Sequence, residues 1–213
     1  MTVLLAHGWG FDARLWDAVR ARLDPALNVE TIDFGYFGAA KLGAGRTATL
    51  AVGHSFGALW WLAQQDIPWR RLLCINGFAR FTATADYPGV APRLLERMRR
   101  QFANDPAAVL ADFHARCGGS VPAAHCDPAR LAAGLAQLAE GDARAALAAR
   151  GADVFALAGS DDPIVPRAMS EAAFAALPAG QLAFADSPGH LLPLSHPALC
   201  AQWIARLSAG LAP

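Results

Sequence analysis

The chain has 213 residues, 54% of them hydrophobic and 17% charged, so it can bury a sizeable core and is not a disordered polypeptide. Its 18 basic and 18 acidic side chains cancel, which excludes a strong overall attraction to nucleic acid or to a membrane surface. We expect one globular domain that meets any charged partner through a local patch.

The first predicted strand is the apolar run from Thr2 to Ala6, which His7-Gly8 ends. No basic residue leads into this run, so we expect neither a signal peptide nor a membrane span, and we expect a cytoplasmic protein. The four cysteines lie far apart, which favours reduced thiols packed as small hydrophobic side chains.

The next elements are a helix and a second strand. Asp12 can cap a helix whose Leu15, Val19 and Leu23 fall at helical spacing, and Pro25 ends it. Residues 28–33 predict the strand. Only about 15 residues then lead to the next apolar run, too few for the usual crossover helix of a parallel pair. We expect this crossover to be missing or abbreviated.

The segment from Gly53 to Gly57 carries the strongest motif. It follows the apolar run of residues 48–52 and enters a helix-forming stretch, so it predicts a strand, a tight turn and a helix. Gly53 and Gly57 provide the small residues that such a turn requires on either side of Ser55. The turn exposes a hydroxyl and aims the first helical amides at it, so Ser55 is the predicted nucleophile.

The rest of the chain alternates strand and helix except at 79–150. Residues 71–76, 153–158 and 181–185 predict strands, while 166–177 and 197–207 predict helices. The stretch 79–150 contains no convincing strand and offers a series of helix starts at Pro92, Asp105-Pro106, Asp127-Pro128 and Asp142. We therefore predict an α/β fold with a mostly parallel, doubly wound sheet of about six strands, formed by 1–78 and 151–213, and a small helical lid inserted at 79–150.

A serine nucleophile needs a base, and the base needs an acid that holds its tautomer. In this type of fold both follow the serine, on loops at the carboxyl ends of later strands. Asp162 follows the strand ending at Ala158, and His190 follows the last predicted strand. Asp162 and His190 are therefore the predicted acid and base.

Three nearby residues are rivals for these roles. Asp161 competes with Asp162 for the acid role, and Asp162 also has an alternative interpretation as a turn or capping residue. His196 precedes Pro197, where capping or packing is expected, and His54 has the simpler interpretation of a packed histidine.

An acyl-transfer site also needs hydrogen-bond donors for the oxyanion. They are the amide of the residue after the nucleophile and an amide from the loop after the first strand, here Phe56 and Trp9. The loop His7-Gly8-Trp9-Gly10 has the alternative interpretation of an ordinary tight turn.

Together, His7 to Gly10, Gly53 to Gly57, Gly159 to Pro166 and Gly189-His190 resemble the α/β-hydrolase superfamily. Within it the chain most resembles the pimeloyl-[acyl-carrier protein] methyl ester esterases of biotin synthesis. This finer resemblance rests on His7 to Gly10, on Phe81 to Gly89 with its Tyr87-Pro88-Gly89, and on His190 to Pro197, where Leu194-Ser195-His196-Pro197 follows the histidine. It implies a serine carboxylesterase without a cofactor, acting on a small ester that is carrier-bound in the family.

The chain departs from the family pattern in four places. The hairpin before the first strand is absent, the crossover before Ser55 is short, the lid is small, and the loop Asp33 to Gly38 lacks the family's proline. These departures leave the mechanism intact and concern the identity of the substrate.

The expected lid contains one basic helix face, made by Arg93, Arg97 and Arg100 opposite an apolar face. Such a helix is by default a solvated surface helix packed on a core. The alternative is a docking face for an acidic carrier protein, which the resemblance favours.

No metal, nucleic-acid or membrane partner is expected, and we expect a monomer. The histidines and cysteines at 114, 117, 125 and 126 match no zinc-binding spacing. The rival functions are a general short-chain esterase or lipase, a carbon-carbon hydrolase, a perhydrolase, and a non-catalytic ligand-binding protein. An epoxide or haloalkane hydrolase is disfavoured, because those enzymes use a carboxylate where this chain has Ser55.

Overall fold

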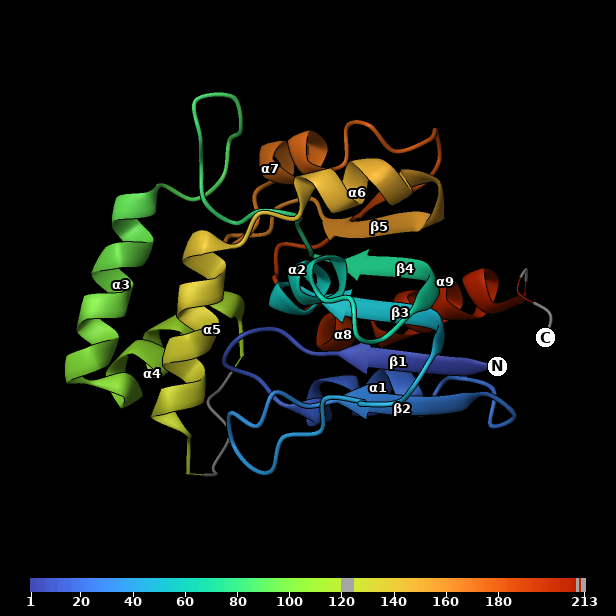
Figure 1. Ribbon diagram of the computed structural model, residues 1–213, viewed down its shortest axis with the longest axis horizontal. Coiled ribbons are helices and arrows are strands. Elements are labelled where there is room, and N and C mark those ends of the chain that lie inside the picture. The colour runs from blue at the N-terminus through green and yellow to red at the C-terminus, as the bar shows by residue number, and fades with distance from the viewer. Residues whose placement is uncertain (120–124, 210, 212–213) are drawn as a thin grey trace.

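The computed structural model describes residues 1–119, 125–209 and 211, so small parts of the predicted lid and core lie outside the described residues. In the described part, six strands form one parallel sheet in the order β2-β1-β3-β4-β5-β6 (Figure 1). The strands are β1 Thr2–Ala6, β2 Asn28–Ile32, β3 Ala48–His54, β4 Trp69–Ile75, β5 Val154–Gly159 and β6 Leu182–Ala185. The predicted parallel, doubly wound fold is confirmed.

Helices cover both faces of the sheet, which explains why its central strands are mainly apolar. On one face α1 Asp17–Arg20, α8 Leu192–Ser195 and α9 Pro197–Ala209 pack together, and α9 contacts β3 and β4. On the other, α2 Phe56–Ala63 packs on β3 and contacts α6 Arg144–Arg150, while α7 Arg167–Ala173 packs on β5. Short 3₁₀ turns, η1 Ala13–Trp16 and η2 Gly151–Asp153, precede α1 and β5.

The first helix is shorter and less regular than predicted. Asp12 does cap it, accepting from the amide of Arg14, but the first turn is the 3₁₀ helix η1. Tight turns follow α1, in which Arg22 donates to the carbonyl of Val19 and Leu23 to that of Arg20. The α conformation is disfavoured immediately before Pro25, so the chain leaves the helix early.

The crossover between β2 and β3 is abbreviated, as expected. Residues 33–47 are all described, and they form a loop that lacks a helix. Asp33 and Lys41 exchange two backbone hydrogen bonds of 2.9 and 2.8 Å, so the loop folds back beside the end of β2.

Four helices lie between β4 and β5. We call three of them the lid helices: α3 Pro92–Asn104, α4 Pro106–Cys117 and α5 Pro128–Glu140. Each begins with proline, and Asp105 and Asp127 cap α4 and α5 through their side chains. Figure 1 shows the lid helices beside the carboxyl ends of the strands, toward which the arrows point. The fourth helix, α6, packs on α2 and thus belongs with the helices that cover the sheet.

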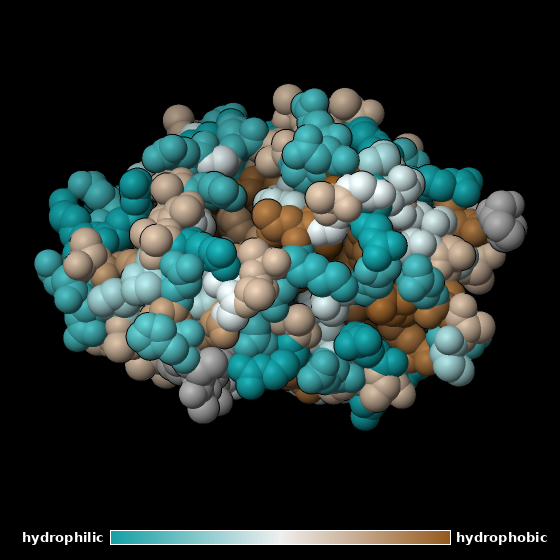
Figure 2. Space-filling view, turned by 60° about the horizontal axis from the view of Figure 1, so that its bottom comes forward, coloured by the Kyte–Doolittle hydropathy of each residue, from teal (hydrophilic) through white to brown (hydrophobic). Residues whose placement is uncertain are grey.

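The surface is mixed in polarity. On the face shown in Figure 2, hydrophobic residues gather mainly in hollows between hydrophilic ones. Few large hydrophobic side chains are strongly exposed among the described residues, the most prominent being Leu42, Leu94 and Leu194. None of the helices described is both long and apolar enough to cross a membrane.

Candidate active site

Ser55 lies on the tight turn between β3 and α2, with a left-handed backbone at φ 52°. Both glycines of the motif are needed there. A Cβ on Gly53 would lie 2.5 Å from the backbone nitrogen of Ala58, and one on Gly57 would lie 2.5 Å from the carbonyl oxygen of Ala6. The turn therefore forces Ser55 into a strained conformation, a feature concentrated at functional sites.

The two other predicted catalytic residues form a buried pair. His190 Nδ1 donates to Asp162 Oδ2 at 2.7 Å, and both side chains are inaccessible to solvent. The second ring nitrogen of His190, Nε2, is buried without a hydrogen-bond partner in the described part of the chain. The ring of His54, the neighbour of Ser55, lies 4.8 Å from the ring of His190. The pair is thus held at the turn that carries Ser55.

The carboxylate of Asp162 is held by several donors. Oδ1 accepts from the backbone amides of Ile164 at 2.8 Å and Val165 at 3.0 Å, while Oδ2 accepts from His190 and from Asn76 Nδ2. Burial by itself would raise the pKa of Asp162, but the neighbouring His190 and these hydrogen bonds hold it below its usual value. Asp162 is therefore ionised and oriented toward His190.

The rival residues have different surroundings. Asp161 is exposed and accepts a hydrogen bond of 2.9 Å from the hydroxyl of its neighbour Ser160. His196 is partly exposed, and its Nδ1 lies 2.9 Å from Ser195 Oγ. In the hydrogen bonds described, neither Asp161 nor His196 contacts the side chains of Asp162 or His190.

His54 connects the turn of Ser55 with the backbone of His190. Its Nε2 lies 2.9 Å from the carbonyl oxygen of His190, so this nitrogen carries the proton and donates. Burial, together with the nearby His190, lowers the pKa of His54 to about 3. A neutral ring that donates to the His190 backbone fits the interpretation of His54 as a packed histidine.

The predicted oxyanion donors lie on two neighbouring segments. Phe56 is the first residue of α2, so its amide has no carbonyl partner within the helix. The loop after β1 reaches the same turn, because a Cβ on Gly8 would lie 3.2 Å from the Cβ of Ser55. Trp9 follows Gly8 in this loop. The fold thus brings the loop that carries the Trp9 amide to the serine turn.

The lid helices hold the loop that carries Trp9. The indole of Trp9 donates to the carbonyl of Leu131 in α5 at 2.8 Å, and its ring packs against Phe113 of α4. His114 of α4 lies with Nε2 2.6 Å from the carbonyl oxygen of Gly10. These contacts could not be predicted from sequence spacing, because they join residues about a hundred positions apart.

Sequence reasoning also missed Asn76, which directly follows β4. Its side-chain amide donates to Asp162 Oδ2 at 2.5 Å. A signal was present, since a polar residue after an apolar strand stands at the carboxyl end of the sheet, where such sites form.

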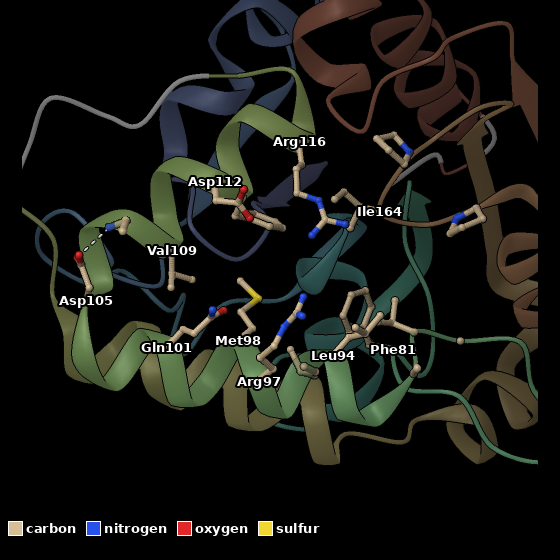
Figure 3. A pocket seen from close by; sticks show the side chains of 18 of the residues that line it. Phe81, Leu94, Arg97, Met98, Gln101, Asp105, Val109, Asp112, Arg116 and Ile164 are labelled. Atoms are coloured by element: carbon tan, nitrogen blue, oxygen red, sulfur yellow. Dashed lines mark hydrogen bonds between the residues drawn. The ribbon is translucent and has the colours of Figure 1, made fainter.

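A pocket of about 890 Å³, the lid groove, lies between α3, α4, the segment 81–91 and the loop after Asp162. Figure 3 shows Arg97 of α3 and Arg116 of α4 pointing into it from opposite sides. Ile164, which also lines the groove, donates its amide to Asp162. The apolar side chains of the lining are Phe81, Val90, Leu94, Leu95, Met98, Val109, Phe113 and Ile164.

The three predicted lid arginines have different surroundings. Arg97 lines the lid groove, and Arg93 is exposed at the start of α3. Arg100 forms an ion pair of 2.9 Å with Glu96 and lies beside a smaller hollow between α3 and α5. The basic face is therefore partly neutralised at Arg100.

Comparison with known proteins finds relatives over nearly the whole chain, although no protein-family model matches. A pimeloyl-[acyl-carrier protein] methyl ester esterase of Aromatoleum aromaticum is 31% identical over 248 aligned positions, covering 98% of each chain. One of Yersinia pestis is 27% identical, covering 92% of this chain and 88% of the relative.

Solved structures show the same fold at lower sequence identity. An esterase from Exiguobacterium antarcticum matches with a TM-score of 0.80 and 16% identity, over 98% of this chain and 92% of that chain. A thermophilic esterase from Thermogutta terrifontis matches with a TM-score of 0.77 and 20% identity, over 100% and 91%. These likenesses identify the α/β-hydrolase fold.

Proposed function

Because this chain belongs to the pimeloyl-[acyl-carrier protein] methyl ester esterase family, we propose that it hydrolyses the methyl ester of an acyl chain carried by an acyl carrier protein, with Ser55 as its nucleophile. It is a carboxylesterase of the α/β-hydrolase fold. The observation that best supports the proposed mechanism is the buried Asp162–His190 pair beside the strained turn of Ser55.

The proposed first step is acylation. Ser55 Oγ attacks the ester carbonyl while His190 Nε2 takes the hydroxyl proton, and Asp162 stabilises the imidazolium that forms. The amides of Phe56 and Trp9 donate to the carbonyl oxygen as it becomes negative. The tetrahedral intermediate then expels methanol, which receives its proton from His190, and the acyl group stays on Ser55.

The second step is hydrolysis of the acyl-enzyme. His190 Nε2 takes a proton from water as the water attacks the acyl carbonyl, and the same two amides hold the oxyanion. Collapse of the intermediate returns the proton to Ser55 and releases the carboxylic acid. Asp162 stays ionised through both steps, which its lowered pKa supports.

The lid groove is our candidate for the acyl-binding site. Its volume lies in the range of small-molecule pockets, and its lining is mainly apolar, as a methylene chain requires. The groove reaches the loop of Asp162 at Ile164, whose amide donates to the Asp162 carboxylate. We propose that an acyl chain lying in the groove presents its ester end to Ser55.

The exposed face of α3 is our candidate docking surface for the acidic carrier. The helix contains four arginines and one glutamate, and Arg93 and Arg97 are exposed. Charges of this kind act mainly on the rate of association, and salt screens them. By the same proposal, the carboxylic acid product supplies biotin synthesis.

Replacing Arg93, Arg97 and Arg100 together with alanine tests this docking surface. We expect kcat/KM for a carrier-bound methyl ester to fall about 10- to 100-fold at low salt. Hydrolysis of a short free aryl ester, which has no long acyl chain to lie in the groove lined by Arg97, should change much less. The matched control replaces Arg20, Arg22 and Arg70, which are exposed at the end of α1, in the turn after it and at the start of β4.

The expected loss shrinks as ionic strength rises, and the control variant shows little of it. An equal response of both substrates, or no response of either, would mean that α3 is an ordinary solvated helix. The protein would then be a general carboxylesterase.

A further inference from the structure

Asn76 is completely buried at the end of β4. Its backbone and side-chain N–H groups connect β4 with β5 and with the loop that carries Asp162. Its backbone N–H donates to the carbonyl of Leu157 in β5 at 2.9 Å. Its side-chain Nδ2 donates to Asp162 Oδ2 at 2.5 Å.

The conformation of Asn76 is costly. Its backbone is left-handed at φ 46°, and Ser55 is the other non-glycine residue described with a positive φ. The side-chain oxygen of Asn76 is buried without a hydrogen-bond partner in the described part of the chain. Glycine would adopt this backbone with less strain and would bury no unpaired carbonyl. Stability alone therefore does not explain an asparagine at this position.

The hydrogen bond from Asn76 complements those that Asp162 receives from its own loop. The amides of Ile164 and Val165 both donate to Oδ1 and leave Oδ2 for His190. Asn76 donates to the same oxygen as His190, from a neighbouring strand. The carboxylate is thereby held against rotation, with Oδ2 directed at the histidine.

We propose that Asn76 is a positioning residue of the esterase reaction, holding Asp162 toward His190 and moderating the basicity of the shared oxygen. This inference rests on the proposed serine-esterase function. A donor to a carboxylate disperses its charge. Without Asn76, Oδ2 is more basic and less well oriented, so His190 binds a proton more tightly and receives it from Ser55 in a poorer geometry.

Asn76→Gly removes the donor and suits the left-handed backbone. On a free aryl ester we expect kcat to fall about 10-fold with KM within about twofold of wild type. On the low-pH side of the kcat/KM profile, which we call the acid limb, the rate falls as the proposed base His190 is protonated. In this variant that fall should occur about half a pH unit or more higher than in wild type. Ser170→Ala is the control, since it removes a different buried polar side-chain group, a hydroxyl on α7.

Asn76→Asp is the second variant, and it keeps the shape while replacing the donor with a carboxylate. Two adjacent carboxylates cannot both ionise easily, so we expect kcat of this variant on the aryl ester to be more than about 100-fold below that of wild type at pH 8. The difference from wild type should shrink as the pH falls. A proton shared by the two carboxylates restores a donor to Asp162.

The two proposals fail in different ways. If folded wild-type protein does not hydrolyse the aryl ester, the proposed function is wrong. If wild type is active but Asn76→Gly leaves both kcat and the acid limb unmoved, or shifts the limb downward, the positioning role of Asn76 is wrong. Thermal unfolding of each variant reports whether a loss of activity reflects a loss of folding.

Discussion

Replacing Asp162 with asparagine tests the proposed catalytic triad most sharply, because the carboxylate accepts from donors on both oxygens. Ile164 and Val165 donate to Oδ1, while His190 and Asn76 donate to Oδ2. An asparagine has one oxygen and one NH₂ group, so it can satisfy only one of these pairs. The two backbone N–H groups can only donate, whereas the imidazole can move its proton to the other ring nitrogen and accept at Nδ1.

We therefore expect the asparagine oxygen to face the amides and its NH₂ group to face His190. The histidine then accepts at Nδ1 and carries its proton on Nε2, the atom that must receive the proton of Ser55. Loss of the productive tautomer should lower kcat by about 10³- to 10⁴-fold, equivalent to about 4–5.5 kcal/mol of activation free energy.

The assay is steady-state hydrolysis of a free aryl ester, with Asp161→Asn as the matched control. Asp161 is exposed and contacts the hydroxyl of Ser160, so Asp161→Asn should lower kcat by less than about threefold. A larger loss in Asp161→Asn than in Asp162→Asn, or a loss below tenfold in Asp162→Asn, would refute the reasoning.

Two further predictions concern the loop of Trp9 and the base of the lid. Trp9→Phe removes the indole donor to Leu131 and should destabilise the fold by about 2–3 kcal/mol while lowering kcat several-fold, because the amide proposed as an oxyanion donor lies on this loop. Trp69→Phe also removes an indole donor to a carbonyl, that of Trp61, and should affect stability without a comparable loss of kcat. Equal kcat losses would contradict the link to the oxyanion. Asp142 accepts from Arg144 and Arg80, and these hydrogen bonds outweigh burial and hold its pKa well below the usual value. A depressed pKa stabilises the fold above the ordinary carboxyl pKa near 4, and this contribution is lost as pH falls below it. In urea unfolding, Asp142→Asn should cost about 1 kcal/mol at pH 7 and clearly less at pH 3, whereas a constant difference would contradict this origin.

Local patterns were sufficient to predict most of the secondary structure. The central strands are mainly apolar because helices cover both faces of the sheet. Asp105 and Asp127 were readable as helix caps, because each precedes a proline that suits the first turn and its side chain can accept from a free backbone amide there. Helix ends were less predictable. The helix expected over 166–177 is α7 Arg167–Ala173, and Phe174 to Leu177 continue as a tighter turn.

The site was only partly readable from the sequence. Ser55 directly follows β3, Asp162 and His190 lie in the loops that follow β5 and β6, and parallel strands bring their carboxyl ends to one edge. The roles of Asn76 and of the lid contacts to Trp9 depend on distant segments meeting, which spacing does not reveal. The ion pair of Arg100 with Glu96 was readable, because residues four apart lie on one helix face.

Covalent labelling of Ser55 tests the central claim most directly. Folded wild-type protein is treated with a fluorophosphonate, and the adduct is located by peptide mass spectrometry. We expect one adduct on the peptide containing Ser55, and Ser55→Ala should lose both the adduct and about 10⁴- to 10⁶-fold of its aryl-ester turnover while remaining folded. Folded protein without an adduct at Ser55, or a Ser55→Ala variant that retains activity, would contradict the account.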